Sequence, residues 1–369
     1  MSEHSLLAPS SYGRLAYCRA APTMEAAYPD EDSLHAIEGR AAHAVAYDYA
    51  STGIMPALRS PSPHGVEVTQ DMIDGAQLYI DDIASELGAA WRNHIFMEQR
   101  ADLSGLHPLA WGTPDADAAY PGFIYLWDYK YGHRYVDPFE NWQLIGYMYD
   151  LVSKLSVEEE LTTTVQMTIV QPRNFHRDGP IRRWTVKASE LRPYFNILKG
   201  WLAEATAEVI DASPSPSGCQ DCSARHVCVA LRDAAYAAMD YAQRAVAHNL
   251  QPDQLGIELA RVEDMADLLE AYKSGLEEEA VGVLRRGANV PHYTMAPGRA
   301  SLEWAMPPEF VAGQLSDKLW APRKLITPTQ AKTQKLVTEE LLDAFAHRPP
   351  GALKLARVDN KLAKKVFKS

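Results

Sequence analysis

The apolar run Phe123–Trp127, FIYLW, which leads directly into Asp128, Tyr129 and Lys130, constrains the fold most strongly. A short continuous apolar run bounded by a glycine turn is typical of a buried central strand. Because side chains alternate along a strand, Asp128 and Lys130 are expected on one face and Tyr129 on the other. We therefore expect a sheet whose central strand ends in a carboxylate and an amine that share one site.

A second acid, Asp115, precedes this strand in the sequence GTPDA. Two carboxylates at the ends of neighbouring strands can hold a hard divalent cation through oxygen. A lysine beside them can orient or deprotonate a water molecule, or neutralise phosphate charge. These are the groups of a metal-dependent phosphodiesterase. The alternative is that Asp115 is a turn residue after Pro114, and that Asp128 and Lys130 form a surface ion pair.

Hydrophobic periodicity and turn residues predict an α/β fold with a mixed sheet flanked by helices. Strands are predicted over His94–Ala101, Pro108–Ala118, Gly122–Lys130, Thr162–Gln171 and Ile181–Lys187. Helices are predicted over Ser33–Ala50, Thr69–Leu87, Pro138–Leu155, Ser189–Ile210, Val229–His248 and Leu255–Arg286. Residues 1–30 are expected to be irregular. We expect a core over residues 1–230 and a mainly helical C-terminal region with a basic tail over residues 231–369.

Two predicted helices carry further candidate site residues. His43 shares a helix face with Gly39, which would allow another backbone or DNA to approach closely, and imidazole can complete a carboxylate site for manganese. Gln143 and Tyr147 are four residues apart and share a face of their helix, where they could orient Lys130 or contact a phosphate. Ordinary helix packing is the alternative for each.

Two glutamates have less specific signals. Glu38 competes with His43 as a helix ligand, but a solvated helix charge is the interpretation that we favour. Glu98 lies in a predicted strand, where it either faces solvent beside Arg100 or supports the metal site.

The cysteines form the most specific local pattern. The chain has four, and Cys219, Cys222 and Cys228 follow the spacing C-x2-C-x5-C, with Cys18 far upstream. Four thiolates suit either zinc or a 4Fe–4S cluster, and ligand count does not separate the two. Disulfides are disfavoured in the cytosolic setting that we expect. Buried free thiols are the alternative.

Composition narrows the class of protein. The chain has 369 residues, 47% of them hydrophobic, which is enough for one large core or two domains. It lacks an apolar run of about 18 residues and a basic segment before an apolar one, so we expect a cytoplasmic protein without a membrane span. The net charge of −12 argues against a uniformly basic nucleic-acid binder, but not against an enzyme with a local basic groove.

The order of these residues resembles the RecB-like branch of the PD-(D/E)XK nucleases. A helix with Gly39 and His43 comes first, then Asp115, then Asp128-Tyr129-Lys130, then Gln143 and Tyr147. One cysteine before this core and three after it resemble the iron–sulfur nucleases of that branch, which include AddB-type and CRISPR-adaptation nucleases. The segments IEGRAAHAVA, WDYKYG, CQDCSARHVC and LITPTQA are similar to those of a phage and prophage family of RecB-like proteins.

The resemblance implies a role for each matching residue. His43, Asp115, Asp128 and the backbone carbonyl of Tyr129 would hold Mg²⁺ or Mn²⁺. Lys130 would be the catalytic lysine, with Gln143 and Tyr147 lining the site. Cys18, Cys219, Cys222 and Cys228 would hold a structural 4Fe–4S cluster, with zinc as the alternative. The second acid is Asp128 rather than Glu, a departure that the RecB branch tolerates.

The expected function is metal-dependent hydrolysis of DNA, as an exonuclease in phage replication or recombination. DNA is the expected partner, together with a phage single-strand-binding or recombination protein. The alternative is a DNA-end-binding or scaffold protein that keeps the nuclease fold without catalysis.

Overall fold

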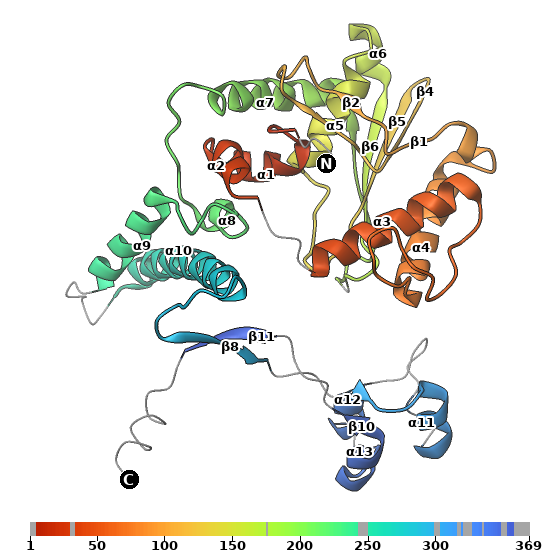
Figure 1. The fold of residues 1–369 in the computed structure, drawn as a ribbon. Coiled ribbons are helices and arrows are strands. Elements are labelled where there is room, and N and C mark those ends of the chain that lie inside the picture. Colours follow the sequence, from red (N-terminus) through yellow and green to blue (C-terminus); the bar gives the residue numbers. More distant parts are fainter. Residues whose placement is uncertain are drawn as a thin grey trace. The chain divides into compact units, whose positions relative to one another are not determined.

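A mixed five-stranded sheet forms the centre of the N-terminal part of the chain (Figure 1). Its strands run in the order β1 (Phe96–Met97), β4 (Ala116–Tyr120), β5 (Phe123–Tyr129), β6 (Thr164–Val170) and β7 (Ile181–Lys187). Strands β5 and β6 are parallel, and the other neighbours are antiparallel. The FIYLW run is therefore the central strand, and the predicted α/β class with a mixed sheet flanked by helices is confirmed.

The computed structural model describes residues 5–29, 34–174, 176–242, 250–298, 303–315, 319, 327–333, 336–347 and 353–357. The chain divides into two compact units, Met1–Lys273 and Ser274–Ser369. The division lies within a long helix, and the boundary expected after residue 230 stays a prediction.

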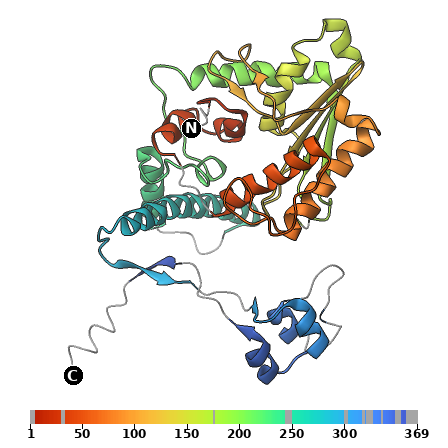
Figure 2. The ribbon, with the colours of Figure 1, turned by 45° about the vertical axis from the view of Figure 1, so that its right-hand side comes forward.

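Helices cover both faces of the sheet (Figures 1 and 2). Helices α3 (Leu34–Thr52) and α4 (Gln70–Leu87) cover one face, and α5 (Trp142–Val152) and α7 (Arg192–Glu204) cover the other. The alternation along β5 explains both layers, since Trp127 and Tyr129 lie in the core cluster of α3 and α4. Ile124 and Leu126 lie in the cluster that contains α5 and α7.

The parallel pairing of β5 with β6 requires a crossover, which α5 and α6 (Val157–Thr162) provide. Asn141 caps α5 by accepting hydrogen bonds from the backbone N–H groups of Gln143 at 3.1 Å and Leu144 at 3.3 Å. The helix therefore begins at Trp142 rather than at the predicted Pro138. Ser156 and Glu159 form a capping box at the start of α6.

The N-terminal segment is helical, so its predicted irregular structure is wrong. It contains the 3-10 helix η1 (Pro9–Ser11) and the short helices α1 (Tyr12–Leu15) and α2 (Ala21–Ala27). Leu7, Tyr12 and Leu15 are fully buried in the core cluster that contains α5 and α7. Helices this short are stabilised by tertiary burial rather than by propensity, which sequence periodicity does not reveal.

Two predicted strands are each divided in the structure. The predicted strand His94–Ala101 is interrupted at Glu98, whose φ of 48° is left-handed, and becomes β1 and β2 (Ala101–Asp102). The predicted strand Pro108–Ala118 becomes β3 (Trp111–Gly112), which pairs with β2, and β4, which pairs with β1. A further 3-10 helix, η2 (Trp91–Asn93), precedes β1.

The first unit ends with helices around the cysteine-rich segment. The predicted helix Ser189–Ile210 is observed as η3 (Ala188–Leu191) followed by α7. Then come α8 (Pro216–Cys219), α9 (Val229–Ala242) and α10 (Pro252–Arg285), which continues into the second unit. The end of the predicted helix at His248 lies outside the described residues. Leu231 of α9 and Ala271 of α10 form a small core with Cys219 and Cys228.

The second unit contains strand pairs as well as the expected helices. Strand β8 (Tyr293–Pro297) pairs with β11 (Leu353–Arg357), and β9 (Glu303–Trp304) pairs with β10 (Ala346–His347). Its helices are α11 (Pro308–Leu315), α12 (Pro328–Thr333) and α13 (Glu339–Phe345). The end of the basic tail, residues 358–369, lies outside the described residues. Among the helices described, none is long and apolar enough to cross a membrane.

Candidate functional site

The C-terminal end of β5 carries a hydrogen-bonded group of three side chains. Lys130 Nζ donates to Asp128 Oδ1 at 3.1 Å and to Gln143 Oε1 at 3.2 Å. Gln143 Nε2 donates to the same Asp128 oxygen at 3.0 Å. The strand alternation that puts Asp128 and Lys130 on one face directs both toward α5, whose first turn supplies Gln143. The amine, the carboxylate and the amide therefore hold one another in place.

Asp115 lies across from Asp128 because it directly precedes β4, whose Ala116 pairs with Trp127. Its Oδ2 accepts a hydrogen bond from the backbone N–H of Tyr129 at 2.7 Å. Its Oδ1 lies 3.2 Å from His43 Nδ1, which comes from α3 on the other layer. The site thus joins side chains from both helical layers and from two adjacent strands.

The charges at the site are mutually dependent. Burial opposes the charged form of His43, but the charge of Asp115 and its hydrogen bond outweigh this and raise the pKa of His43. The same pair lowers the pKa of Asp115 against the effect of burial. Burial and the nearby Asp115 charge raise the pKa of Asp128. Asp128 in turn raises the pKa of Lys130.

One buried carboxylate oxygen of this site accepts no hydrogen bond from the described residues. Asp128 is 4% exposed, and its Oδ2 lies 3.0 Å from Lys130 Nζ but accepts no hydrogen bond from the described residues. A buried carboxylate oxygen without a hydrogen bond is costly. A divalent cation between Asp115 and Asp128 would satisfy it, since hard cations take carboxylate oxygens. The donor set of His43, Asp115 and Asp128 therefore fits a cation chemically.

Tyr129 and Tyr147 lie against the site in different ways. Tyr129 contributes its backbone, while its buried ring packs against His43, with the ring centroids 5.2 Å apart. The ring of Tyr147 on α5 lies over Gly112, where a Cβ would come within 2.9 Å of it. Burial, followed by the charges of Asp115 and Asp128, raises the pKa of Tyr147, so it is present as the neutral phenol.

The two glutamates have separate surroundings. Glu98 lines a second pocket together with His43, Asp115 and Tyr129. Its pKa is raised by burial and by the charge of Asp115. Glu38 instead forms an ion pair with Arg173 at 3.0 Å. The structure therefore places Glu98 beside the candidate site and gives Glu38 a partner of its own.

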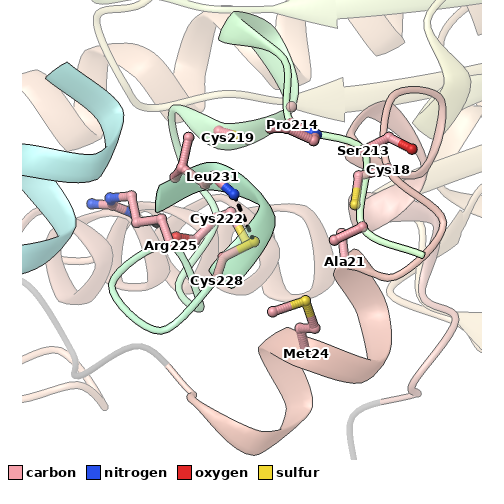
Figure 3. A pocket seen from close by; sticks show the side chains of 12 residues that line it. Cys18, Ala21, Met24, Ser213, Pro214, Cys219, Cys222, Arg225, Cys228 and Leu231 are labelled. Carbon is pink, nitrogen blue, oxygen red and sulfur yellow. Dashed lines mark hydrogen bonds between the residues drawn. The ribbon is translucent and has the colours of Figure 1, made fainter. Parts of the chain in front are cut away.

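The four cysteines line one pocket of about 330 Å³, including its open mouth (Figure 3). Cys18 enters from the N-terminal segment, and Cys219, Cys222 and Cys228 come from the segment around α8 and the start of α9 (Figure 3). The backbone N–H of Ser215 donates to Cys219 Sγ at 3.4 Å, and that of Leu231 donates to Cys228 Sγ at 3.5 Å. The fold thus brings together thiols about 200 residues apart in the sequence.

The chemistry of this pocket fits a thiophilic metal group. Burial raises the pKa of Cys219, and burial together with Glu25 raises the pKa of Cys222 to about 11. A bound metal reverses this effect, because it deprotonates the thiols that coordinate it. Throughout the described ranges, no three Cys, His, Asp or Glu side chains are already grouped closely enough to hold a metal ion. The cysteines would therefore have to draw together on binding, and so would the carboxylates of the β5 site.

The sequence assigned no role to the residue that anchors the loop between β5 and α5. Gln171, fully buried at the end of β6, donates to the carbonyls of Gly132 at 2.8 Å and Arg134 at 2.6 Å. Its Oε1 accepts from Val136 N at 3.2 Å and from Arg182 Nη2 at 2.5 Å. This loop connects Lys130 to Gln143, so Gln171 fixes the connection between them. A single glutamine after a strand carries no local signal of such a role.

The fold and these sites define an α/β protein with a carboxylate–lysine group at the end of its central strand and a separate cysteine pocket. The chain belongs to the DUF2800 family, described as a protein of unknown function, whose family profile matches residues 4–362.

Proposed function

We propose that this protein is a divalent-metal-dependent nuclease of the RecB-like PD-(D/E)XK type that acts on DNA as an exonuclease. The observation that carries the proposal is the meeting of His43, Asp115, Asp128, Lys130 and Gln143 at one end of the sheet. The mixed sheet with helices on both faces supports the fold assignment.

Each residue has a defined task in this mechanism. Asp115, Asp128, His43 and the Tyr129 carbonyl would hold Mg²⁺ or Mn²⁺, which when bound supplies Lewis acidity toward the scissile phosphate. Lys130, kept cationic by Asp128, positions the attacking water and stabilises negative charge that develops on the phosphate. Gln143 orients Lys130, and Asp115 holds the ring of His43 through Nδ1.

Exposed histidine and arginine side chains beside the site are the groups that a nucleic-acid substrate would meet. The loop after Lys130 carries His133 and Arg134, and the β6–β7 loop carries His176 and Arg177, all four of them exposed. The two loops are joined, because His133 Nδ1 lies 3.0 Å from the Arg173 carbonyl oxygen. Arg134 pairs with Asp221 at 2.6 Å, and Arg177 lies 3.7 Å from Asp178, so a polyanion would replace these carboxylates as the partner of the two guanidinium groups.

The cysteine pocket would hold a structural 4Fe–4S cluster, with zinc as the alternative. Four cysteine ligands suit both. Broad visible absorbance with stoichiometric iron and sulfide in anaerobically purified protein is the expected result. A colourless protein with one equivalent of zinc would assign zinc instead.

The nuclease proposal is tested by following degradation of open and end-blocked DNA with Mn²⁺. Asp128→Ala and Lys130→Ala should each abolish cleavage and leave the protein folded. Lys154→Ala is the matched control, because Lys154 lies exposed just after the end of α5 and pairs with Asp150 at 3.0 Å. Undiminished cleavage by Lys130→Ala would refute the assignment, and metal-independent DNA binding without cleavage would indicate a scaffold protein.

A further inference from the structure

The N-terminal segment Pro9–Cys18 lies between the candidate active site and the cysteine pocket. At one end, Tyr12 of α1 is fully buried against α5, the helix that carries Gln143 and Tyr147. At the other end, Cys18 lines the cysteine pocket. Only five residues separate Tyr12 from Cys18, so a shift of Cys18 can be transmitted to Tyr12.

The contact with α5 is closer than ordinary packing. A Cβ built at Gly146 would lie 2.6 Å from Cε2 and 2.8 Å from Cδ2 of Tyr12, distances that real Cβ atoms do not adopt. Gly146 therefore forms a recess in α5 that the Tyr12 ring fills. Gly112, just before Asp115, has a similar recess, where a Cβ would lie 2.7 Å from Pro9 Cδ and 2.9 Å from Tyr147 Cε1.

The opposite end of the segment is held by the cysteine-rich region. A Cβ at Gly218, beside Cys219, would lie 2.8 Å from Cβ of Tyr17. Arg14 pairs with Glu25 at 2.8 Å, and Glu25 accepts a hydrogen bond from Ser223 N at 3.4 Å. The position of α1 against α5 therefore depends on how firmly the cysteine-rich segment is held.

We propose that Tyr12 is a positioning residue through which occupancy of the cysteine pocket sets the divalent-cation affinity of the Asp115–Asp128 site. The inference rests on the proposed function and deepens it by naming a regulator of the same site. Ligation of Cys18 together with Cys219, Cys222 and Cys228 fixes α1. The Tyr12 ring then holds α5 in position. Gln143 on α5 in turn holds the side chains of Asp128 and Lys130 in place through its hydrogen bonds.

The first test measures Mn²⁺ affinity by isothermal titration calorimetry on the full chain. Tyr12→Ala should keep its cysteine-bound metal, measured by metal analysis, yet bind Mn²⁺ at least tenfold more weakly. Tyr12→Phe should restore the wild-type affinity, because the hydroxyl has no hydrogen-bond partner among the described residues. Leu191→Ala controls for lost stability, since Leu191 is fully buried in the same core cluster but lies on η3.

Gly146→Ala disrupts the same contact between Tyr12 and α5 from the α5 side. It therefore still tests the proposal if Tyr12→Ala does not fold. Alanine favours a helix over glycine, so weaker Mn²⁺ binding by this variant reports the displaced Tyr12 ring rather than a weaker helix. Equal losses of affinity in Tyr12→Ala and Leu191→Ala would overturn the proposal.

The second test is a thermodynamic cycle between the two sites. Removing the metal from the cysteine pocket should lower Mn²⁺ affinity in the wild type but cause no further loss in Tyr12→Ala. Additive losses would overturn the coupling while leaving the nuclease proposal intact. If the wild type binds no Mn²⁺, or if Asp128→Ala binds it unchanged, the proposed function itself fails.

Discussion

Asp117 is a buried carboxyl group that is close in sequence to the candidate site but has no part in it. It lies two residues beyond Asp115 on β4 and is 8% exposed. Burial and the charge of Asp150 raise the pKa of Asp117 to about 6, against the opposing charge of Lys154. The folded state therefore binds this proton more tightly than the unfolded state, which makes the ionised form a source of instability above that pH.

Asp117→Asn is expected to stabilise the protein at pH 8 but not at pH 4. Wild-type stability due to this group is greatest below the unfolded pKa near 4 and is lost as the pH rises to about 6. Ionisation of Asp117 in the folded state therefore lowers the free energy of unfolding by on the order of 2–3 kcal/mol, which follows from the difference between the folded and unfolded pKa values. Urea unfolding of both proteins at pH 4 and pH 8 measures the difference. A gain that does not change with pH would contradict the assignment.

Glu98 holds a backbone conformation that glutamate rarely adopts. Its φ of 48° interrupts the strand, and its side chain lines the pocket that contains His43 and Asp115. Asparagine enters the left-handed region more readily, so Glu98→Asn should raise the free energy of unfolding by about 0.5–1 kcal/mol. The same variant should bind Mn²⁺ more weakly, because strain of this kind gathers at functional sites. Gln99→Asn is the control, and a loss of stability in Glu98→Asn would contradict the strain argument.

At the residue scale, the spacing of the candidate site residues can be read from the sequence, but the contacts between their side chains cannot. The alternation of a strand places Asp128 and Lys130 on one face, and helix geometry places Gln143 and Tyr147 on one face. The left-handed Glu98 and the orientation of His43 by Asp115 depend on contacts between distant segments. Local patterns carry no information about such contacts.

Among the helices, α3 and α4 each contain a glycine, with opposite surroundings. A Cβ at Gly75 of α4 would clash with the Tyr129 hydroxyl and lie 3.0 Å from Pro172 Cγ. A Cβ at Gly39 of α3 would meet nothing within 4 Å. Gly75 therefore sets the distance between α4 and the end of β5, and Gly39 leaves the surface of α3 open near His43.

Gly75→Ala is expected to lower the free energy of unfolding by about 1–3 kcal/mol, because overpacking outweighs the gain in helix propensity. Gly39→Ala should raise it by about 0.5–1 kcal/mol, because only the propensity changes. Thermal melting of both variants tests the pair. Stabilisation by both substitutions would show that α4 can move away from β5 without cost.

Gln171, which directly follows β6, can be compared with Gln166, which lies within β6. Gln171→Leu removes the bonds to Gly132, Arg134 and Val136 and should cost about 3 kcal/mol, since several buried backbone groups lose their partner. Gln166→Leu on β6 should cost little, because the buried Gln166 Nε2 has no partner among the described residues. Urea unfolding gives both values, and limited proteolysis between residues 131 and 141 should be faster only in Gln171→Leu.

At the element scale, long amphipathic helices and the alternating strand β7 are predictable from sequence, and Ile181–Lys187 is confirmed residue for residue. The short helices α1 and α2 and the divided strands β1–β4 are not. Their boundaries follow from burial of Leu7 and Tyr12 and from the turn at Glu98 rather than from local propensity.

The two units of the whole chain suggest that the first can fold without most of the second. A chain that ends at Arg286 keeps α10 intact and should melt within a few degrees of the first unit in the full chain, measured by calorimetry. A chain that ends at Ala242 loses Ala271 and its neighbours, which pack against Cys219 and Cys228. It should melt at a lower temperature, and its cysteines should react faster with a thiol reagent. Equal behaviour of the two truncated chains would contradict this role of α10.

The burial of α1 against α5 has a consequence for synthesis on the ribosome. The recess at Gly146 and the thiols after residue 218 are made long after Tyr12 and Cys18. At about 5–20 residues per second, Cys219 follows Cys18 by roughly 10–40 s. Leu7, Tyr12 and Leu15 thus remain without α5 until after Gly146 is made, and Cys18 remains without its partner thiols until after Cys228 is made. A tag or chaperone that occupies this segment during that interval would delay maturation of both sites.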